Sequence, residues 1–169
     1  QRKILYTLFS LSEKDALKPR KVFELTAKTA EKAQYHHGDS SLNGTIMGMM
    51  QTWCGSNNIP LLGHEGFIGT RFGLGQDGGA PRYVYSCLSK ITRYIFPKID
   101  DELLELTEED GVMVEPKYYI PIIPMVLING AVGIGTGYST SVPLHNQYQI
   151  IEFLIKMLRT NLDLKDLPE

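Results

Sequence analysis

The chain has 169 residues, a length that fits one domain or one domain with part of another. Its hydrophobic content of 43% excludes a disordered chain, whereas the formal net charge of −2 decides nothing by itself about binding to nucleic acid. Cys54 and Cys87 lack the paired spacing of a zinc site and form no disulfide framework, which fits a reducing compartment. No apolar run reaches the length of a membrane span, and no signal peptide is present at the start.

Charge is distributed unevenly along the chain. Residues 1–32 carry eight lysines and arginines against four acidic residues, whereas residues 98–115 carry one lysine against eight acidic residues. A basic beginning and an acidic middle suggest one face for an anionic polymer and another turned away from it, although two solvated faces with chance bias would look the same. The chain begins without a methionine and ends in a charged segment, so we expect a piece of a longer protein.

The first third predicts two helices. Residues 4–9 form a short apolar run with Tyr and Thr that we interpret as a strand. A helix is expected after Pro19, and a second one after Asp39 and Ser40, which are good N-cap residues. Both have apolar residues at helical spacing: Val22, Leu25, Thr29 and Ala33 in the first, and Leu42, Ile46, Met49, Met50 and Trp53 in the second.

Residues 63–79 follow these helices and contain seven glycines interleaved with Phe67, Ile68 and Phe72. The aromatic residues need a surface to pack on, so the segment is interpreted as a hairpin or wing rather than a disordered linker. Two helices joined by a tight turn and followed by such a segment predict an α+β chain with a winged helix-turn-helix. Arg71 lies in this segment as a candidate DNA contact, or simply as a solvated charge.

Residues 75–85 contain the chemistry-bearing stretch, in which Gly78 and Gly79 precede Pro81, Arg82 and Tyr83. Glycines allow a backbone to approach another polymer closely, and Pro81 fixes one φ angle just before the pair. Arg82 offers a planar fork of donors suited to a phosphate, and the Tyr83 phenol can attack phosphorus once its proton is removed. An isolated Arg-Tyr pair is more often an ordinary surface turn, so the argument needs the rest of the chain.

The second half yields weaker predictions. Val84, Leu88, Ile91 and Ile95 recur at helical spacing, so a helix is expected from residue 84 to 95 with Tyr83 at its entrance. The acidic stretch 98–115 is expected to be a surface connection, and residues 119–129 a buried strand preceded by prolines. Asn146 is expected to cap a last helix with Ile150, Ile151, Leu154 and Leu158 on one face.

Residues 130–137 alternate glycine with other residues, as dinucleotide-binding loops do. Such a loop must open directly into a helix whose backbone N–H groups meet the pyrophosphate. Residues 138–143 do not resemble a helix start, and the chain has no GxxxxGK[ST] motif, so a nucleotide site is not expected.

Several motifs occur in one order along the chain: Tyr35-His36-His37-Gly38-Asp39, Gly55-Ser56-Asn57-Asn58, Phe67-Ile68-Gly69-Thr70-Arg71, Asp77 with Pro81-Arg82-Tyr83, Val114-Glu115-Pro116, and residues 121–137. Together they resemble the breakage-reunion region of type IIA DNA topoisomerases in its eukaryotic form. The resemblance extends from Arg2 to about residue 158. It implies a winged-helix (CAP-like) cleavage domain over residues 1–122 and the start of an α/β tower domain over residues 123–169.

The resemblance also implies roles for individual residues. Tyr83 is similar to the family's nucleophile, which forms a 5′-phosphotyrosyl link, and Arg82 would hold the scissile phosphate. His37 would be a further phosphate donor near the reacting group, whereas for His36 a structural hydrogen bond is the better interpretation. Ile134 stands where the family inserts an apolar wedge between base pairs, with a core isoleucine as the alternative. Sequence-independent DNA contacts are expected from Arg2, Lys3 and Arg20, and further DNA contacts from His36, Arg71 and Gln76.

The resemblance places the cofactors and partners outside the chain. Magnesium would be bound by an acidic metal-binding domain and ATP by a separate ATPase domain, because the acidic runs at 100–102 and 108–110 look solvated. The partners would be double-stranded DNA and a second copy of the full-length enzyme, with no membrane. The compartment would be the nucleus for a cellular enzyme, and the host cytoplasm or a virus factory for a cytoplasmic DNA virus.

Some positions depart from the family's pattern. Gln76, Gly78, Gly79 and Ala80 stand where a lysine and small hydroxyl residues are common, which removes possible phosphate contacts. Val132 replaces a common glutamate and Tyr138 a common tryptophan, so the chain resembles a divergent member, viral or protist. The alternative function is a non-catalytic winged-helix DNA-binding module. A purely structural domain would leave the basic beginning and the glycine-flanked Ile134 unexplained.

Overall fold

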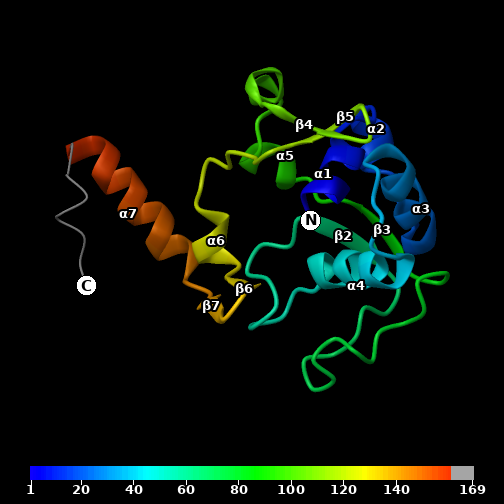
Figure 1. Ribbon diagram of the computed structural model, residues 1–169. Coiled ribbons are helices and arrows are strands. Elements are labelled where there is room, and N and C mark those ends of the chain that lie inside the picture. The colour runs from blue at the N-terminus through cyan, green and yellow to red at the C-terminus, as the bar shows by residue number, and fades with distance from the viewer. Residues whose placement is uncertain (161–169) are drawn as a thin grey trace.

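The computed structural model of the chain describes residues 1–160 (Figure 1). It combines helices with short antiparallel strands, which confirms the predicted mixture of α and β structure. The elements in chain order are α1 (Arg2–Phe9), α2 (Glu13–Ala16), β1 (Arg20–Lys21), α3 (Val22–Lys32), α4 (Asp39–Met50), β2 (Leu62–Glu65), β3 (Tyr85–Leu88), α5 (Thr92–Ile95), the 3-10 helix η1 (Lys98–Leu103), β4 (Leu106–Glu109), β5 (Val112–Pro116), α6 (Met125–Ile128), β6 (Ala131–Gly135), β7 (Tyr138–Val142) and α7 (Gln147–Thr160).

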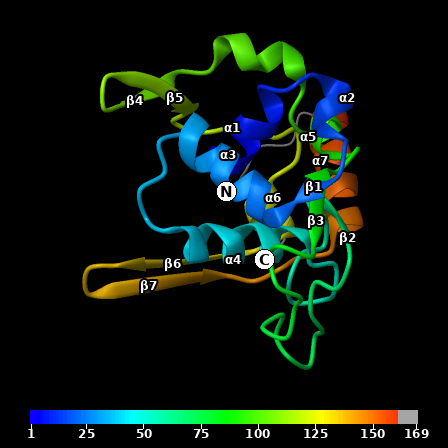
Figure 2. The ribbon, with the colours of Figure 1, turned by 90° about the vertical axis from the view of Figure 1, so that its right-hand side faces the viewer.

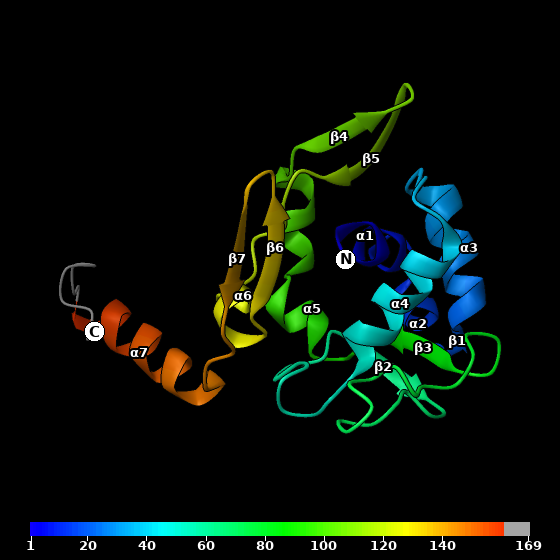
Figure 3. The ribbon, with the colours of Figure 1, turned by 60° about the horizontal axis from the view of Figure 1, so that its bottom comes forward.

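Three small antiparallel sheets are present in residues 1–160. The first has the strand order β1-β3-β2, with Leu62 opposite Leu88 and Lys21 opposite Tyr85. The other two are the hairpins β4–β5 and β6–β7, which extend from the body of the molecule in different places (Figure 3). A winged helix-turn-helix requires two helices followed by a strand–loop–strand wing, and α3, α4 and β2–loop–β3 supply these elements in that order.

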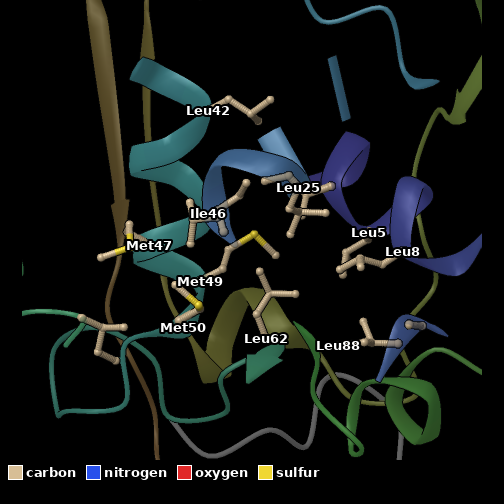
Figure 4. Close-up of a cluster of buried hydrophobic side chains, with 14 of the residues drawn as sticks. Leu5, Leu8, Leu25, Leu42, Ile46, Met47, Met49, Met50, Leu62 and Leu88 are labelled. Atoms are coloured by element: carbon tan, nitrogen blue, oxygen red, sulfur yellow. The ribbon is translucent and has the colours of Figure 1, made fainter. Parts of the chain in front are cut away.

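The core lies where α1, α3 and α4 meet the first sheet (Figure 4). Ile4, Leu25 and Ile46 are completely buried, one from each of these helices. Met47, Met49 and Met50 of α4 fill the space toward β2, since a flexible thioether adapts to an irregular gap. The predicted apolar faces of α3 and α4 are therefore confirmed as core-facing.

Four predicted elements differ from the structure. Residues 4–9 belong to a helix, α1, because Ile4, Leu5 and Leu8 lie on one face at helical spacing. The expected helix over 84–95 is instead strand β3 followed by the short α5. The acidic stretch contains η1 and the β4–β5 hairpin, and 119–129 is irregular chain ending in α6 rather than a strand.

The strand over 85–88 has a clear physical reason. Val84, Ser86 and Leu88 are buried while Tyr85 is exposed, which is the two-residue alternation of a half-buried strand. Ser86 is polar, so its burial is invisible in a hydrophobicity pattern. Cross-strand pairing with both β1 and β2 then overrides the apolar spacing that suggested a helix.

The N-cap prediction for α4 is also off by one residue. Gly38, with φ of 85°, is the N-cap residue, and the helix begins at Asp39. At the other end of the chain, Asn146 caps α7 as predicted, because its Oδ1 accepts hydrogen bonds from the backbone N–H groups of Tyr148 and Gln149 at 2.9 and 3.3 Å. The apolar residues of α7 are not fully buried, and the helix projects from the body (Figure 1).

The core continues beyond residue 122. Ile128 of α6 is completely buried and belongs to the same apolar cluster as α1 and α4. The Asn129 side chain accepts from the Ile59 backbone N–H at 2.9 Å and donates to the Ile59 carbonyl at 2.8 Å. Residues 123–129 are thus attached to the first body, and the division at 122/123 stays a prediction whose second part includes residues 161–169, outside the described chain.

Candidate functional site: the Arg82–Tyr83 segment and the surfaces around it

The backbone of residues 79–84 is attached on both sides to regular structure. Val22 at the start of α3 donates its N–H to the Val84 carbonyl at 2.9 Å, and Phe23 donates to the Pro81 carbonyl at 3.2 Å. Gly79 donates to the Phe67 carbonyl at 2.9 Å, which closes the base of the wing. These bonds hold the segment at the N-terminal end of α3.

Side chains alternate in this segment between anchoring and exposure. Val84 is buried in the core, whereas Arg82 is exposed and Tyr83 is 71% exposed. The Arg82 guanidinium carbon lies 5.6 Å from the centroid of the Tyr83 ring. A phenol that can act as nucleophile and a guanidinium that binds phosphate therefore stand next to each other on a fixed backbone, both open to a large ligand. The expectation that Tyr83 lies at a helix entrance is wrong; it lies directly before β3.

The wing loop, residues 66–84, is closed by Asp77 and Thr70. The Asp77 carboxylate accepts from the Thr70 backbone N–H at 2.8 Å and from its hydroxyl at 2.6 Å. The Thr70 hydroxyl bond and then the backbone bond lower the pKa of Asp77. The loop tip beyond this pair leaves Arg71 and Gln76 exposed. Sequence reasoning gave Asp77 no role of its own.

Glycines make the base of the wing compact. A Cβ on Gly78 would lie 2.9 Å from the Met47 methyl and 3.2 Å from the Ile68 carbonyl carbon. A Cβ on Gly79 would lie 3.1 Å from a Val84 methyl. The two glycines that were expected to allow approach to a polymer are therefore used for close packing against α4 and the wing itself.

His36 and His37 lie at the other end of α3. The two histidines follow the C-terminal end of that helix, whereas Pro81 and Val84 bind its first residues. A helix rises by about 1.5 Å per residue, so the 11 residues of α3 span roughly 16 Å. Figure 2 shows the α3–α4 connection and the wing loop at opposite ends of the two helices. Within this chain, the structure does not bring His37 beside Tyr83.

The turn with the two histidines faces the tip of the β4–β5 hairpin. His36 Nε2 lies 3.3 Å from the Asp110 carboxylate, and the His37 ring contacts the Tyr35 ring edge-on at 5.5 Å between centroids. Lys3 is close by, with its ammonium 2.5 Å from Glu109 and 3.0 Å from Glu115. The acidic stretch predicted to be a plain solvated connection thus supplies ordered partners to basic residues.

The remaining predicted basic contacts have partners inside the chain. Arg2 donates from one guanidinium nitrogen to the carbonyls of Pro116 and Lys117 at 2.7 and 2.5 Å, and the residue is exposed. Arg20 donates to the Asp15 carbonyl, while its Nε is buried without a partner among the described residues. Arg2 keeps further guanidinium donors free for a ligand, because five N–H groups serve two bonds.

Ile134 projects from the β6–β7 hairpin. It is 90% exposed and lies opposite Ser139 in the ladder, with Gly133 and Gly135 on either side. The core-isoleucine interpretation is therefore wrong for the described chain. The glycine run is part of β6 and the turn into β7, and Val132, on the same face as Ile134, is 79% exposed.

Metal-binding and membrane-spanning features were also sought in residues 1–160. This part of the chain contains no group of three or more His, Cys, Asp or Glu side chains arranged to hold a metal ion. None of its helices has the length and apolar character needed to cross a membrane.

Comparison with known proteins identifies the class of the chain. Its fold is similar to the solved Plasmodium falciparum topoisomerase II DNA-binding, cleavage and re-ligation domain, with a TM-score of 0.88 and 44% identity over 96% of this chain and 22% of that one. Mitochondrial DNA topoisomerase 2 of Dictyostelium discoideum is 45% identical over 99% of this chain and 13% of its own length. DNA topoisomerase 2 of Arabidopsis thaliana is 47% identical over 94% of this chain and 10% of its own length.

These relatives define the chain as a region of a type II DNA topoisomerase. The DNA gyrase/topoisomerase IV family matches residues 1–169, and the chain belongs to this family. The chain spans only about a tenth of the length of the curated relatives that it matches. The resemblance seen in the motifs is thus confirmed, while the role of each residue rests on the geometry above.

Proposed function

We propose that this chain carries the nucleophile of a DNA cleavage and religation reaction, and that the nucleophile is Tyr83. Its Oη forms a bond to a backbone phosphorus while the bond from phosphorus to the 3′ oxygen breaks. The phenolic proton is released, and the departing oxygen takes up a proton to become a 3′-hydroxyl. The broken phosphodiester is replaced by a phosphotyrosyl ester at the 5′ end, so resealing needs no new activation.

The observation that carries this proposal is the exposed Tyr83 beside Arg82 on a backbone fixed by α3 and Phe67. A nucleophile must be held in place and must also be reachable by a duplex, and both conditions are met here. The Arg82 guanidinium would bind the scissile phosphate and stabilise the extra negative charge of the pentacoordinate transition state.

His37 would bind phosphate at a second place. The length of α3 separates it from Tyr83, and phosphates along one strand are about 3.4 Å apart, so roughly five nucleotides would lie between the two contacts. Ile134 would insert between base pairs from the β6–β7 hairpin, since its exposed apolar side chain offsets lost stacking. Arg2, Arg20, His36, Arg71 and Gln76 would contribute sequence-independent contacts.

The rest of the protein would supply what this chain lacks. The described residues do not fit magnesium, because no cluster of carboxylates stands at the Arg82–Tyr83 segment or elsewhere in residues 1–160. We infer that an acidic domain outside the chain binds magnesium, that a separate domain uses ATP, and that two copies of the full-length protein each contribute one tyrosine to a double-strand break. The compartment would be the nucleus in a cell, or the host cytoplasm or a virus factory if the protein is viral.

The test compares the full-length protein with its Tyr83→Phe variant. Each is incubated with magnesium and a duplex labelled at the 3′ end of one strand, and the reaction is stopped with denaturant. A 5′-phosphotyrosyl link keeps the 3′-labelled part of the strand on the protein. We expect label on the unchanged protein and none on the variant, with DNA affinity retained in both.

Other results would decide against parts of the proposal. Label on the Tyr83→Phe variant would show that another residue attacks the DNA. Transfer of a 5′ label instead of a 3′ label would reverse the polarity of the link. DNA binding without any covalent product would favour the alternative, a winged-helix module that binds DNA and does no chemistry.

A further inference from the structure

The tip of the β4–β5 hairpin and the α3–α4 turn are held together by charged groups. The hairpin turns at Asp110 and Gly111, both with positive φ, of 52° and 77°. This turn places the Asp110 carboxylate 3.3 Å from His36 Nε2. An acidic element thus lies against the turn that bears the histidine pair, and a simple electrostatic argument would make it an obstacle to DNA.

Lys3 joins three elements at this place. Its ammonium donates to Glu109 of β4 at 2.5 Å, to Glu115 of β5 at 3.0 Å and to the carbonyl of Ala33, just after α3, at 2.5 Å. An ammonium has three N–H donors, and these three acceptors use all of them. Lys3 therefore has no donor left for a DNA phosphate, in contrast to what its sequence position suggested.

Burial makes this cluster more than a surface ion pair. The side chains of Lys3 and Glu115 are 19% and 7% exposed, and that of Glu109 is 38% exposed. Burial alone would lower the pKa of Lys3, but the hydrogen bonds from Glu109 and Glu115 outweigh it and raise the pKa. A charged group left without its partner at such a site is costly, so the three side chains depend on one another.

We propose that Lys3, Glu109 and Glu115 are positioning residues that fix the His36–His37 turn for DNA, so that the acidic hairpin supports DNA binding instead of opposing it. The inference rests on the proposed role of this turn in binding phosphate. Ala33 is bound by Lys3 and precedes His36 by three residues, so the cluster restrains the point at which the chain leaves α3 and enters the turn. Asp110 restrains the same turn from the hairpin side.

Glu109→Gln distinguishes the two ideas by the sign of its effect. If the hairpin only repels DNA, removing one negative charge strengthens binding. If Glu109 positions the turn, removing its charge weakens binding, by about threefold to tenfold for the partial loss of one charged hydrogen bond. The full-length protein is titrated with a fluorescent duplex in the absence of magnesium, so that cleavage does not contribute to the signal.

Glu108→Gln is the matched control on the same hairpin. Glu108 is exposed and is the neighbour of Glu109 in β4, so the two side chains point to opposite faces of the strand. The control removes the same charge at nearly the same place. We expect it to leave DNA affinity unchanged or to raise it slightly, while Glu109→Gln lowers it.

Salt dependence tests Lys3 directly. A lysine that binds a DNA phosphate contributes about 0.9 to the slope of log affinity against log salt concentration. We expect Lys3→Gln to weaken binding with the slope unchanged and Lys3→Arg to restore most of the affinity. A slope lowered by about one contact would show that Lys3 binds phosphate and would overturn the inference.

Two measurements keep the result decisive. If Lys3→Gln does not fold, Glu109→Gln, whose side chain is more exposed, still gives the sign of the effect. Unchanged or stronger binding by Glu109→Gln would overturn the inference. Failure of the proposed chemistry would show separately, as DNA binding by the unchanged protein without a covalent product, because the inference is judged on binding alone.

Discussion

The two ends of α3 are held by different means. At its start, the Arg82–Tyr83 segment is fixed by backbone hydrogen bonds to Val22, Phe23 and Phe67. At its end, the His36–His37 turn is fixed by side-chain charges from Lys3 and Asp110. Backbone bonds depend little on pH, salt or side-chain identity, whereas ion pairs depend on all three. The end that would do the chemistry is therefore the more robust one, and the end that would only bind DNA is the one that solution conditions can change.

The largest effect is expected from removing one backbone bond at the start of α3. Val22→Pro deletes the N–H that binds the Val84 carbonyl, yet proline is well tolerated at the first position of a helix, and Lys21 before it has a compatible extended conformation. The segment with Arg82 and Tyr83 loses one of its two anchors on α3. A displacement near 1 Å costs about a hundredfold in rate, so we expect a loss of that order in single-turnover cleavage by the full-length protein.

Val22→Ala is the control for this change. It removes buried methyl groups but keeps the N–H donor, so it should lower stability without a comparable loss of cleavage rate. Equal cleavage rates in the proline and alanine variants would contradict the view that the backbone bond positions Tyr83.

The charged end should respond to pH. The hydrogen bond from Lys3 lowers the pKa of Glu109 below its usual 4.5. A carboxyl group with a lowered pKa in the folded state adds stability at pH values above the unfolded pKa and loses this contribution as pH falls through the folded pKa. The raised pKa of Lys3 keeps its own contribution intact until pH rises above 10.5.

Urea denaturation of the unchanged protein and of Glu109→Gln measures this contribution. The unchanged protein should be the more stable of the two at pH 7, and the difference should disappear as the pH falls below about 4. High salt should reduce the difference at pH 7, because the Glu109 side chain is partly exposed. A difference that stays constant from pH 7 to pH 3 would show that the ion pair does not contribute.

The sequence allowed prediction of the elements whose core residues are apolar. The spacing of Val22, Leu25 and Leu42, Ile46 identified α3 and α4, and the capping chemistry of Asn146 identified the start of α7. Arg82, Tyr83 and Ile134 were recognised from motifs, and the structure shows all three exposed. Their surroundings depend on long-range pairing, which local patterns do not contain.

The failures have the same origin. The apolar run that became α1 is compatible with either period, and contact with β5 and α3 decides for helix. Ser86 is buried in β3 although it is polar, which hid the strand. Lys3 looked like a DNA contact because its partners, Glu109 and Glu115, are more than 100 residues away in sequence. A charge pattern read along the chain cannot show that one ammonium already has three acceptors.

The smallest global effect is expected in the wing loop, which is held by a side chain but lies next to the robust end. Asp77→Ala removes both acceptors of Thr70, whereas Thr70→Val removes only the hydroxyl bond and keeps the backbone N–H donor. Because the loop contributes little to the core, the midpoint of global unfolding should not change in either variant. Local opening should nevertheless increase, more in Asp77→Ala than in Thr70→Val, and limited proteolysis within residues 70–77 should speed up several-fold in that order.

Cleavage of DNA by the same two variants then shows how far the wing and the Arg82–Tyr83 segment depend on each other. Gly79 closes the base of the wing through its bond to Phe67, and the Asp77–Thr70 pair lies outside this closure. Loss of the pair should therefore weaken DNA binding through the exposed Arg71 and Gln76 while the rate of cleavage from the bound state stays nearly the same. A bound-state rate that falls together with proteolytic stability would mean that the wing loop, and not α3 alone, positions Tyr83.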